Sequence, residues 1–95
     1  MNEKRELQAI FKGQVQGVGF RWTVVEHAEN CKITGTVHNR PDGTVEIIAQ
    51  GREASLKQFL DAIQKSPGHA KITSIRTHYR TLTTEYAEFT ILHLS

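Results

Sequence analysis

The sequence predicts an α+β fold, a two-layer sandwich in which two helices lie against a mainly antiparallel sheet. Three observations indicate this class. Apolar residues alternate with polar ones in several short runs, as in half-buried strands. Two longer segments carry apolar residues three and four positions apart, as in amphipathic helices. Turn-forming clusters of Pro and Gly separate these segments, and 95 residues give room for one domain, spanning residues 1–95.

The first strand and the first helix flank a glycine-rich stretch. Leu7, Ala9 and Phe11 alternate with polar residues, although Ile10 on the polar side weakens the pattern. After the glycines, apolar residues spaced four, four and three apart predict a helix from about residue 21 to residue 30. The members of this stripe are Phe20, Val24, Ala28 and Cys31.

A hairpin and a second helix follow. Two alternating runs, residues 33–37 and 45–49, are joined by Pro41-Asp42-Gly43, where Pro presets φ and Gly supplies a positive φ. The second helix is indicated by apolar residues at i, i+3, i+4 and i+7, which are Leu56, Phe59, Leu60 and Ile63. Ser66-Pro67-Gly68 ends this helix, because Pro cannot continue it.

The last part of the chain predicts two less regular strands, at about residues 71–79 and 89–94. The gap between Ile72 and Ile75 breaks strict alternation and indicates a β-bulge. The element order is therefore β-α-β-β-α-β, with room for a short fifth strand at the end. This is the order of a ferredoxin-like α/β sandwich.

Composition excludes several classes of partner. The formal charge is only +2 and the basic residues are scattered, so nucleic acid is not expected, and no apolar run reaches the length of a signal peptide or membrane span. Cys31 is the only cysteine, which excludes an internal disulfide and indicates a cytoplasmic protein. It continues the apolar helix face, so packing is expected rather than nucleophilic chemistry. The five histidines lack the spacing of a zinc site, and we expect a monomer without metal or cofactor.

The segment from Gly13 to Arg21 predicts an anion-binding cradle between the first strand and the first helix. Glycines let successive backbone N–H groups turn inward, and a helix N-terminus adds unpaired donors with a partial positive charge. Arg21 adds a planar fork of donors. Phosphate fits such a site well, although a turn of this kind is by itself often only a tight connection.

Asn39 closes the second predicted strand, and the topology brings it near the cradle. A right-handed crossover makes the first two strands parallel, so the cradle and Asn39 lie at the same edge of the sheet. With one strand between them, the two positions are roughly 10 Å apart at the backbone. Arg21 would then hold phosphoryl oxygens while Asn39 orients a water for attack on phosphorus. Neither residue is a nucleophile, which suits an already activated phosphoryl group such as an acyl phosphate.

Two motifs in the chain resemble the signatures of the acylphosphatase family. The first reads Gly13-x-Val15-Gln16-Gly17-Val18-Gly19-Phe20-Arg21, and the second reads Gly35-x-Val37-x-Asn39-x-x-x-Gly43-x-Val45. The resemblance spans nearly the whole chain. It implies a ferredoxin-like enzyme that hydrolyses acyl phosphates to carboxylate and phosphate, without a metal and without a covalent phosphoenzyme.

The resemblance also implies roles for seven residues of the two motifs. Arg21 binds phosphate through its side chain, and Asn39 places the attacking water. Backbone N–H groups that hold phosphate come from Gln16, Gly17, Val18, Gly19 and Phe20.

Several positions depart from the pattern of that family. Thr36 stands where an aromatic residue is usual, and His38 stands where Lys or Arg is common. The first helix usually runs into Leu-Gly, whereas here Cys31-Lys32 replaces that pair. This removes the glycine that could end the helix in the left-handed conformation without the steric cost of a Cβ.

Other interpretations remain open from the sequence. Asn39 before a Pro-Asp-Gly turn commonly serves the hydrogen bonds of the turn itself. An accessory domain that binds phosphoanions without turnover, or a hydrolase directed at carbamoyl phosphate, would use the same cradle. An RNA-recognition module is a weak alternative, because the third strand lacks aromatic residues. We expect Phe20 to lie in the core, whereas Trp22 fits either the core or a contact with an acyl group.

Overall fold

The computed structural model describes residues 3–82 and 84–93, and it has the predicted element order with a fifth strand. The elements are β1 (Lys4–Gln14), α1 (Phe20–Cys31), β2 (Thr34–Asn39), β3 (Val45–Arg52), α2 (Glu53–Lys65), β4 (Lys71–Arg80) and β5 (Phe89–Ile91). Both predicted helices and the hairpin are confirmed. β5 is shorter than the expected segment 89–94, whose last residue lies outside the described residues.

The five strands form one sheet in the order β4-β1-β3-β2-β5. β1 pairs antiparallel with β3 and β4, and β2 pairs antiparallel with β3. β5 pairs parallel with β2, so the sheet is mixed, with its parallel pair at one edge. β3 lies between β1 and β2, which is the arrangement that the estimated spacing between the cradle and Asn39 required.

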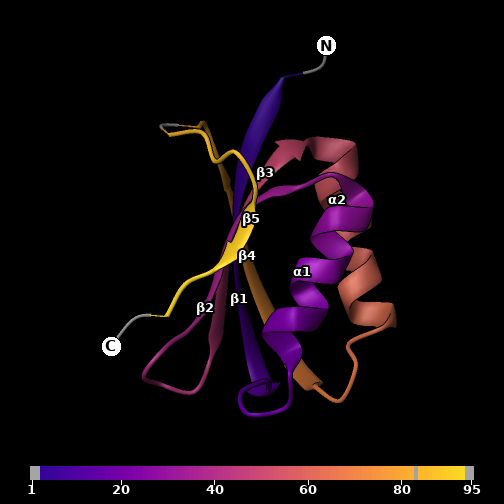
Figure 1. Ribbon diagram of the computed structural model, residues 1–95, viewed down its shortest axis with the longest axis vertical. Coiled ribbons are helices and arrows are strands. Elements are labelled where there is room, and N and C mark those ends of the chain that lie inside the picture. The colour runs from indigo at the N-terminus through magenta and orange to yellow at the C-terminus, as the bar shows by residue number, and fades with distance from the viewer. Residues whose placement is uncertain (1–2, 83, 94–95) are drawn as a thin grey trace.

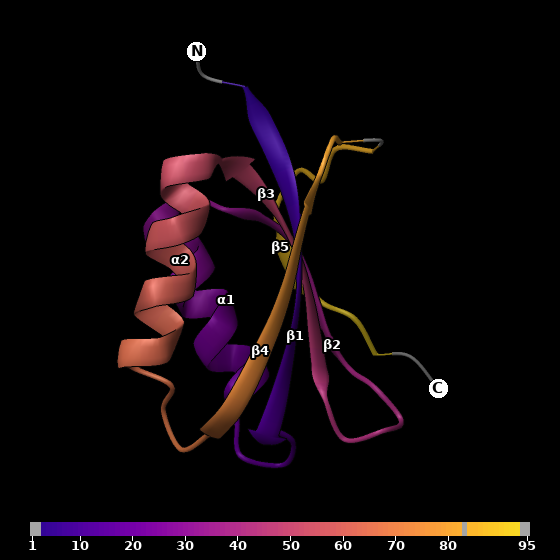
Figure 2. The same cartoon turned by 180° about the vertical axis from the view of Figure 1, so that it is seen from behind.

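The two helices cover one face of the sheet, and Figure 1 shows them packed side by side against it. Figure 2 shows the molecule from behind, with both helices again on the same side of the sheet. The connection from β1 to α1 and the turn from β2 to β3 lie at the same end of the molecule (Figure 1). This end is where the two sequence motifs meet.

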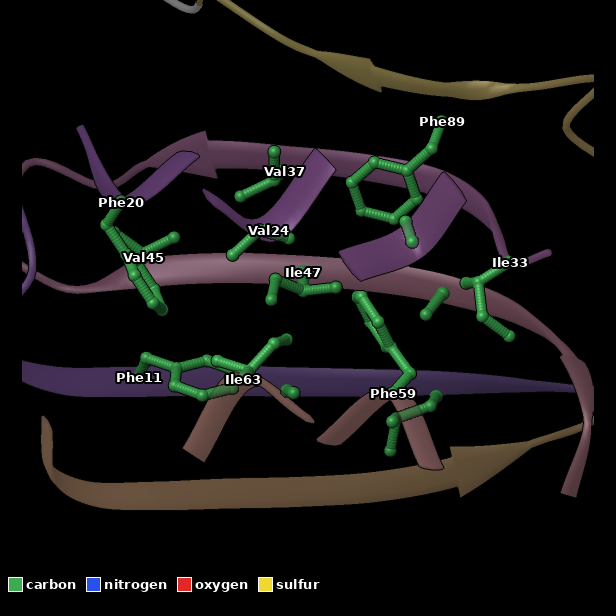
Figure 3. Packing of buried hydrophobic residues seen from close by; sticks show 14 of the residues in the cluster. Phe11, Phe20, Val24, Ile33, Val37, Val45, Ile47, Phe59, Ile63 and Phe89 are labelled. Carbon is green, nitrogen blue, oxygen red and sulfur yellow. The ribbon is translucent and has the colours of Figure 1, made fainter. Parts of the chain in front are cut away.

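The core fills the space between the helices and the sheet (Figure 3). The alternating residues of β1 and β3 point inward, as predicted, and are fully buried: Leu7, Ala9, Phe11, Val45, Ile47 and Ala49. The helical stripes meet them with Phe20, Val24, Ala28, Leu56, Phe59 and Ile63. The Phe59 ring packs edge-on against Phe89 of β5, with ring centroids 5.8 Å apart, so the fifth strand shares the core.

The predicted irregularity in β4 is a β-bulge. Lys12 of β1 is opposite Ser74, and the next residue, Gly13, is opposite Ile72. Thr73 is therefore the extra residue, and its hydroxyl donates to the Lys12 carbonyl at 3.1 Å. The three-residue gap in the apolar pattern marked this position correctly.

The C-terminus of α1 has a left-handed residue that is not glycine. Lys32 has φ 58° and ψ 45°, and no other non-glycine residue among those described has a positive φ. Its N–H donates to the Glu29 carbonyl at 3.2 Å, and the N–H of Ile33 donates to the Ala28 carbonyl at 2.8 Å. This is the Schellman arrangement, in which glycine is favoured at the position that Lys32 occupies. The departure at Lys32 noted in the sequence therefore falls on the left-handed residue.

Candidate active site

The loop between β1 and α1 has the backbone of an anion cradle. Gly17 has φ 75° and Gly19 has φ 77°, whereas the residues that precede them, Gln16 and Val18, do not have positive φ. Alternation of negative and positive φ is the pattern that directs successive N–H groups into one concavity. A Cβ on either glycine would meet nothing within 4 Å, so the backbone conformation, not crowding, requires glycine here.

The helix start adds further donors to this loop. Gly19 is the N-cap of α1, no side chain caps the helix, and no acidic residue lies in its first turn. The first N–H groups of the helix therefore remain free, with the positive end of the helix dipole behind them. Phe20 fixes the helix start against the sheet, because its side chain is 1% exposed and its ring centroid lies 5.4 Å from that of Phe11. Its expected place in the core is confirmed.

Arg21 lies in the first turn of α1 and is partly buried. Among residues 3–82 and 84–93, no carboxylate lies within ion-pair distance of its guanidinium. The neighbouring Trp22 is 69% exposed and so does not belong to the core. The first turn of α1 thus presents one cation without a protein counter-ion and one uncovered aromatic ring.

Asn39 is the last residue of β2, and its backbone pairs with Val45. Asn39 lies two residues after Val37, a fully buried core residue, so both side chains lie on the face of the sheet that the helices cover. Its Oδ1 atom is buried and accepts no hydrogen bond within the described part of the chain. A buried acceptor without a donor costs free energy, and a bound water or ligand donor would remove that cost.

The turn after Asn39 does not use the Asn39 side chain. The Asp42 carboxylate accepts hydrogen bonds from the Thr44 N–H at 3.0 Å and from the Thr44 hydroxyl at 2.6 Å. These two bonds lower the pKa of Asp42 below its ordinary value. The Gly43 N–H donates to the Arg40 carbonyl at 3.1 Å, which closes the turn. Asp42 therefore takes the role that the turn interpretation gave to Asn39.

The Gln16 side chain joins the cradle to this same turn. Its Nε2 donates to the Arg40 carbonyl and to the Thr44 carbonyl, both at 2.8 Å. Arg40 directly follows Asn39, so the bond fixes the cradle beside the end of β2. The sequence assigned Gln16 only a backbone role, and no local pattern signals this contact, because its acceptors lie 24 and 28 residues away.

The other residues singled out in the sequence lie away from this site. His38 alternates with Asn39 and faces the opposite side of the sheet, where its Nε2 lies 3.3 Å from Glu46 Oε1. Burial raises the pKa of the partly buried Cys31 thiol, which makes the thiolate less accessible and fits a packing role. The described residues contain no group of three His, Cys, Asp or Glu side chains placed to hold a metal. None of their helices combines the length and apolar character needed to cross a membrane.

Comparisons with known proteins give one consistent family. The family model for acylphosphatase matches residues 7–91. An acylphosphatase of Bacillus licheniformis is 54% identical over 71 residues, which cover 75% of this chain and 79% of that protein. One of Geobacillus thermodenitrificans is 37% identical over 89 residues, covering 94% and 95% of the two chains.

Solved structures agree with the sequence comparisons. The crystal structure of acylphosphatase from Bacillus subtilis matches with a TM-score of 0.88 and 36% identity, over 94% of this chain and 99% of that one. Full-length HypF, in a phosphate- and nucleotide-bound form, matches with a TM-score of 0.86 and 26% identity, over 98% of this chain but 12% of that one. The family model, the curated relatives and the fold together show that this chain belongs to the acylphosphatase family and is a hydrolase of acyl phosphates.

Proposed function

We propose that the loop N–H groups of residues 16–20 and the Arg21 guanidinium bind the phosphoryl group, while Asn39 positions the attacking water. The observation that carries this proposal is the buried Asn39 Oδ1, which accepts no hydrogen bond from any described residue. An acceptor in that position accepts a hydrogen bond from a water molecule and turns the oxygen lone pair of that water toward a phosphorus held in the cradle. The Arg21 guanidinium, which has no carboxylate partner among the described residues, supports the assignment of Arg21 to binding the anionic phosphoryl group.

The reaction is a direct displacement at phosphorus. A bond forms between the water oxygen and phosphorus, and the bond between phosphorus and the acyl oxygen breaks, which releases a carboxylate. The proton of the water passes to a phosphoryl oxygen, because His38 lies on the opposite face of the sheet and the Asp42 carboxylate is bound to Thr44, so neither is placed to act as a base at the cradle. Loop N–H groups and Arg21 stabilise the charge on the equatorial oxygens, and the good leaving group makes positioning sufficient.

Substitution of the two side chains tests the proposal. Removing one preorganised donor from such a site costs roughly 10² to 10³ in rate, so Arg21→Ala and Asn39→Ala should each lower kcat on benzoyl phosphate by at least that factor. Asn30→Ala, on the exposed end of α1, and Arg76→Ala, on β4, are the matched controls and should keep wild-type turnover. Near wild-type turnover by either site variant would exclude the assigned roles.

We further propose that the chain acts as a single-domain, monomeric, cytoplasmic enzyme that needs no metal and binds neither nucleic acid nor membrane. EDTA should leave the rate unchanged, inorganic phosphate should inhibit competitively as a product, and sedimentation should give a monomer. A metal requirement or a stable dimer would contradict these points. A panel of acyl phosphates that includes carbamoyl phosphate identifies the preferred acyl group, and phosphate binding without any hydrolysis would indicate an accessory phosphoanion-binding domain.

A further inference from the structure

A groove with no assigned role lies between α1 and β5. Its volume is about 390 Å³. Its walls come from one face of α1 and from the C-terminal strand, with the residues Trp22, Val25, Glu29, Phe89, Ile91 and His93. Most of these side chains are apolar or aromatic. Trp22 and Leu92 are the exposed large apolar residues among those described, and Trp22 is the more exposed of the two.

The groove starts in the first turn of α1, at the same end of the helix as the cradle. Trp22 directly follows Arg21 in the first turn of α1, so the near end of the groove is one residue from the proposed phosphate ligand. Val25 and Glu29 continue the same helix face, and seven residues of helix carry the groove about 10 Å away from the cradle.

The opposite wall runs toward the end of the sheet that holds Asn39. β5 runs parallel to β2, with Ile91 opposite Val37, and the Leu92 N–H donates to the Val37 carbonyl at 2.9 Å. The ladder thus continues beyond β5 toward the end of β2, where Asn39 lies two residues after Val37. In Figure 1 the start of α1 lies at the end of the molecule that holds the cradle, whereas β5 ends nearer the middle of the long axis.

We propose that this groove binds the acyl group of the substrate and selects acyl phosphates whose acyl group is uncharged and is aromatic or branched apolar. This inference rests on the proposed position of the phosphoryl group. With phosphorus held by the cradle and Arg21, the acyl group of the bound substrate extends toward Trp22. The indole face of Trp22 then stacks on an aromatic acyl ring. The volume exceeds the about 150 Å³ of an engineered apolar cavity that binds benzene, so a phenyl ring fits. Glu29 at the far end disfavours acyl groups that end in a carboxylate.

Kinetics with two substrates test the groove. Benzoyl phosphate and acetyl phosphate share the phosphoryl group and differ in the acyl group. Trp22→Ala should raise KM for benzoyl phosphate about threefold to tenfold, the range of one aromatic contact, and should leave kcat and the values for acetyl phosphate nearly unchanged. Leu92→Ala is the matched control, because Leu92 is also exposed and apolar but does not line the groove. Equal KM values for benzoyl phosphate in the wild type and Trp22→Ala would overturn the proposal.

A second readout does not depend on turnover. Trp22 is the only tryptophan in the chain, so its fluorescence reports on the groove alone. Phenacylphosphonate and 2-oxopropylphosphonate are stable analogues of benzoyl and acetyl phosphate with CH₂ in place of the bridging oxygen. We expect the phenacyl analogue to change the Trp22 emission and to bind about threefold to tenfold more tightly than the oxopropyl analogue.

The outcomes separate the groove from the catalytic assignment. If Arg21→Ala and Asn39→Ala keep full activity but the phenacyl analogue still perturbs Trp22, the proposed function fails and the groove stands. If catalysis behaves as proposed but both analogues bind equally, without a change in emission, the groove assignment fails. Emission that changes with protein concentration, together with a dimer in sedimentation, would show that a second copy covers the groove and would also overturn the proposal.

Discussion

Replacing Lys32 by glycine should stabilise the protein. Lys32 has a left-handed backbone with φ 58°, in which a Cβ costs about 1–2 kcal/mol. Glycine removes that cost but loses about 0.5–1 kcal/mol more than other residues through the entropy of the unfolded chain. The Lys32 side chain is exposed, so its removal opens no cavity. The expected net gain in the free energy of unfolding is about 0.5–1 kcal/mol, which for a domain of this size corresponds to a Tm higher by about 2–8 °C.

Lys32→Ala is the matched control for this substitution. It removes the same charge and the same side chain, including any favourable interaction with the helix C-terminus, but it keeps the Cβ in the left-handed region. Urea and thermal unfolding of both variants, with wild type alongside, measure the difference. Activity should not change, because Lys32 follows the C-terminus of α1, whereas the cradle lies at the N-terminus of the same helix. If Lys32→Ala is as stable as Lys32→Gly, the backbone argument is refuted.

Three further predictions follow from other contacts. Gln16→Ala removes two hydrogen bonds between the cradle and the turn, so it should lower the free energy of unfolding by about 1–3 kcal/mol and lower kcat/KM as well; unchanged urea midpoint and kinetics would contradict the link. Gly35→Ala places a Cβ 1.8 Å from the Ile48 carbonyl oxygen and should destabilise by about 3 kcal/mol or more in urea unfolding, so a wild-type midpoint would be inconsistent with this packing. Hydrogen bonds from Thr44 lower the pKa of Asp42 in the folded protein. The Asp42 carboxylate therefore stabilises the fold at pH values above its ordinary pKa of 3.8, and this contribution is lost as the pH falls through the lower pKa of the folded state. Asp42→Asn should therefore unfold at lower temperature than wild type at pH 7, the two should converge in acid, and a Tm difference independent of pH would exclude this linkage.

The sequence predicts those parts of the fold that local patterns encode. The stripe that includes Phe59 and Ile63 fixed the second helix, and the gap between Ile72 and Ile75 marked the bulge, because both signals lie within a few residues. The exact start of α1 differed by one residue, since Phe20 was counted in the stripe but placed before the helix. The left-handed position of Lys32 was also readable, because the family pattern has glycine there.

The rest depends on partners far along the chain. Gln16 finds its acceptors in another loop, and its role is invisible in any window of sequence around it. The place of Trp22 was open, because an aromatic residue at a helix start fits either the core or a contact with an acyl group, and only the packing of α1 against β5 decides between them. The buried, unpaired Oδ1 of Asn39 likewise depends on what surrounds it in three dimensions. The paired motifs predicted which residues form the site, but not the contacts that hold them together.

The bulge in β4 has a consequence for the solubility of the protein. β4 is the outer strand on one side of the sheet and, with ten residues, is by far the longer of the two edges. Long regular edges invite pairing with the strands of other molecules, which begins aggregation. Thr73 interrupts the regular spacing of hydrogen-bonding groups along β4, and the cations Lys71 and Arg76 repel an identical strand. The same irregularity that complicates the sequence pattern thus keeps neighbouring copies from extending the sheet at that edge.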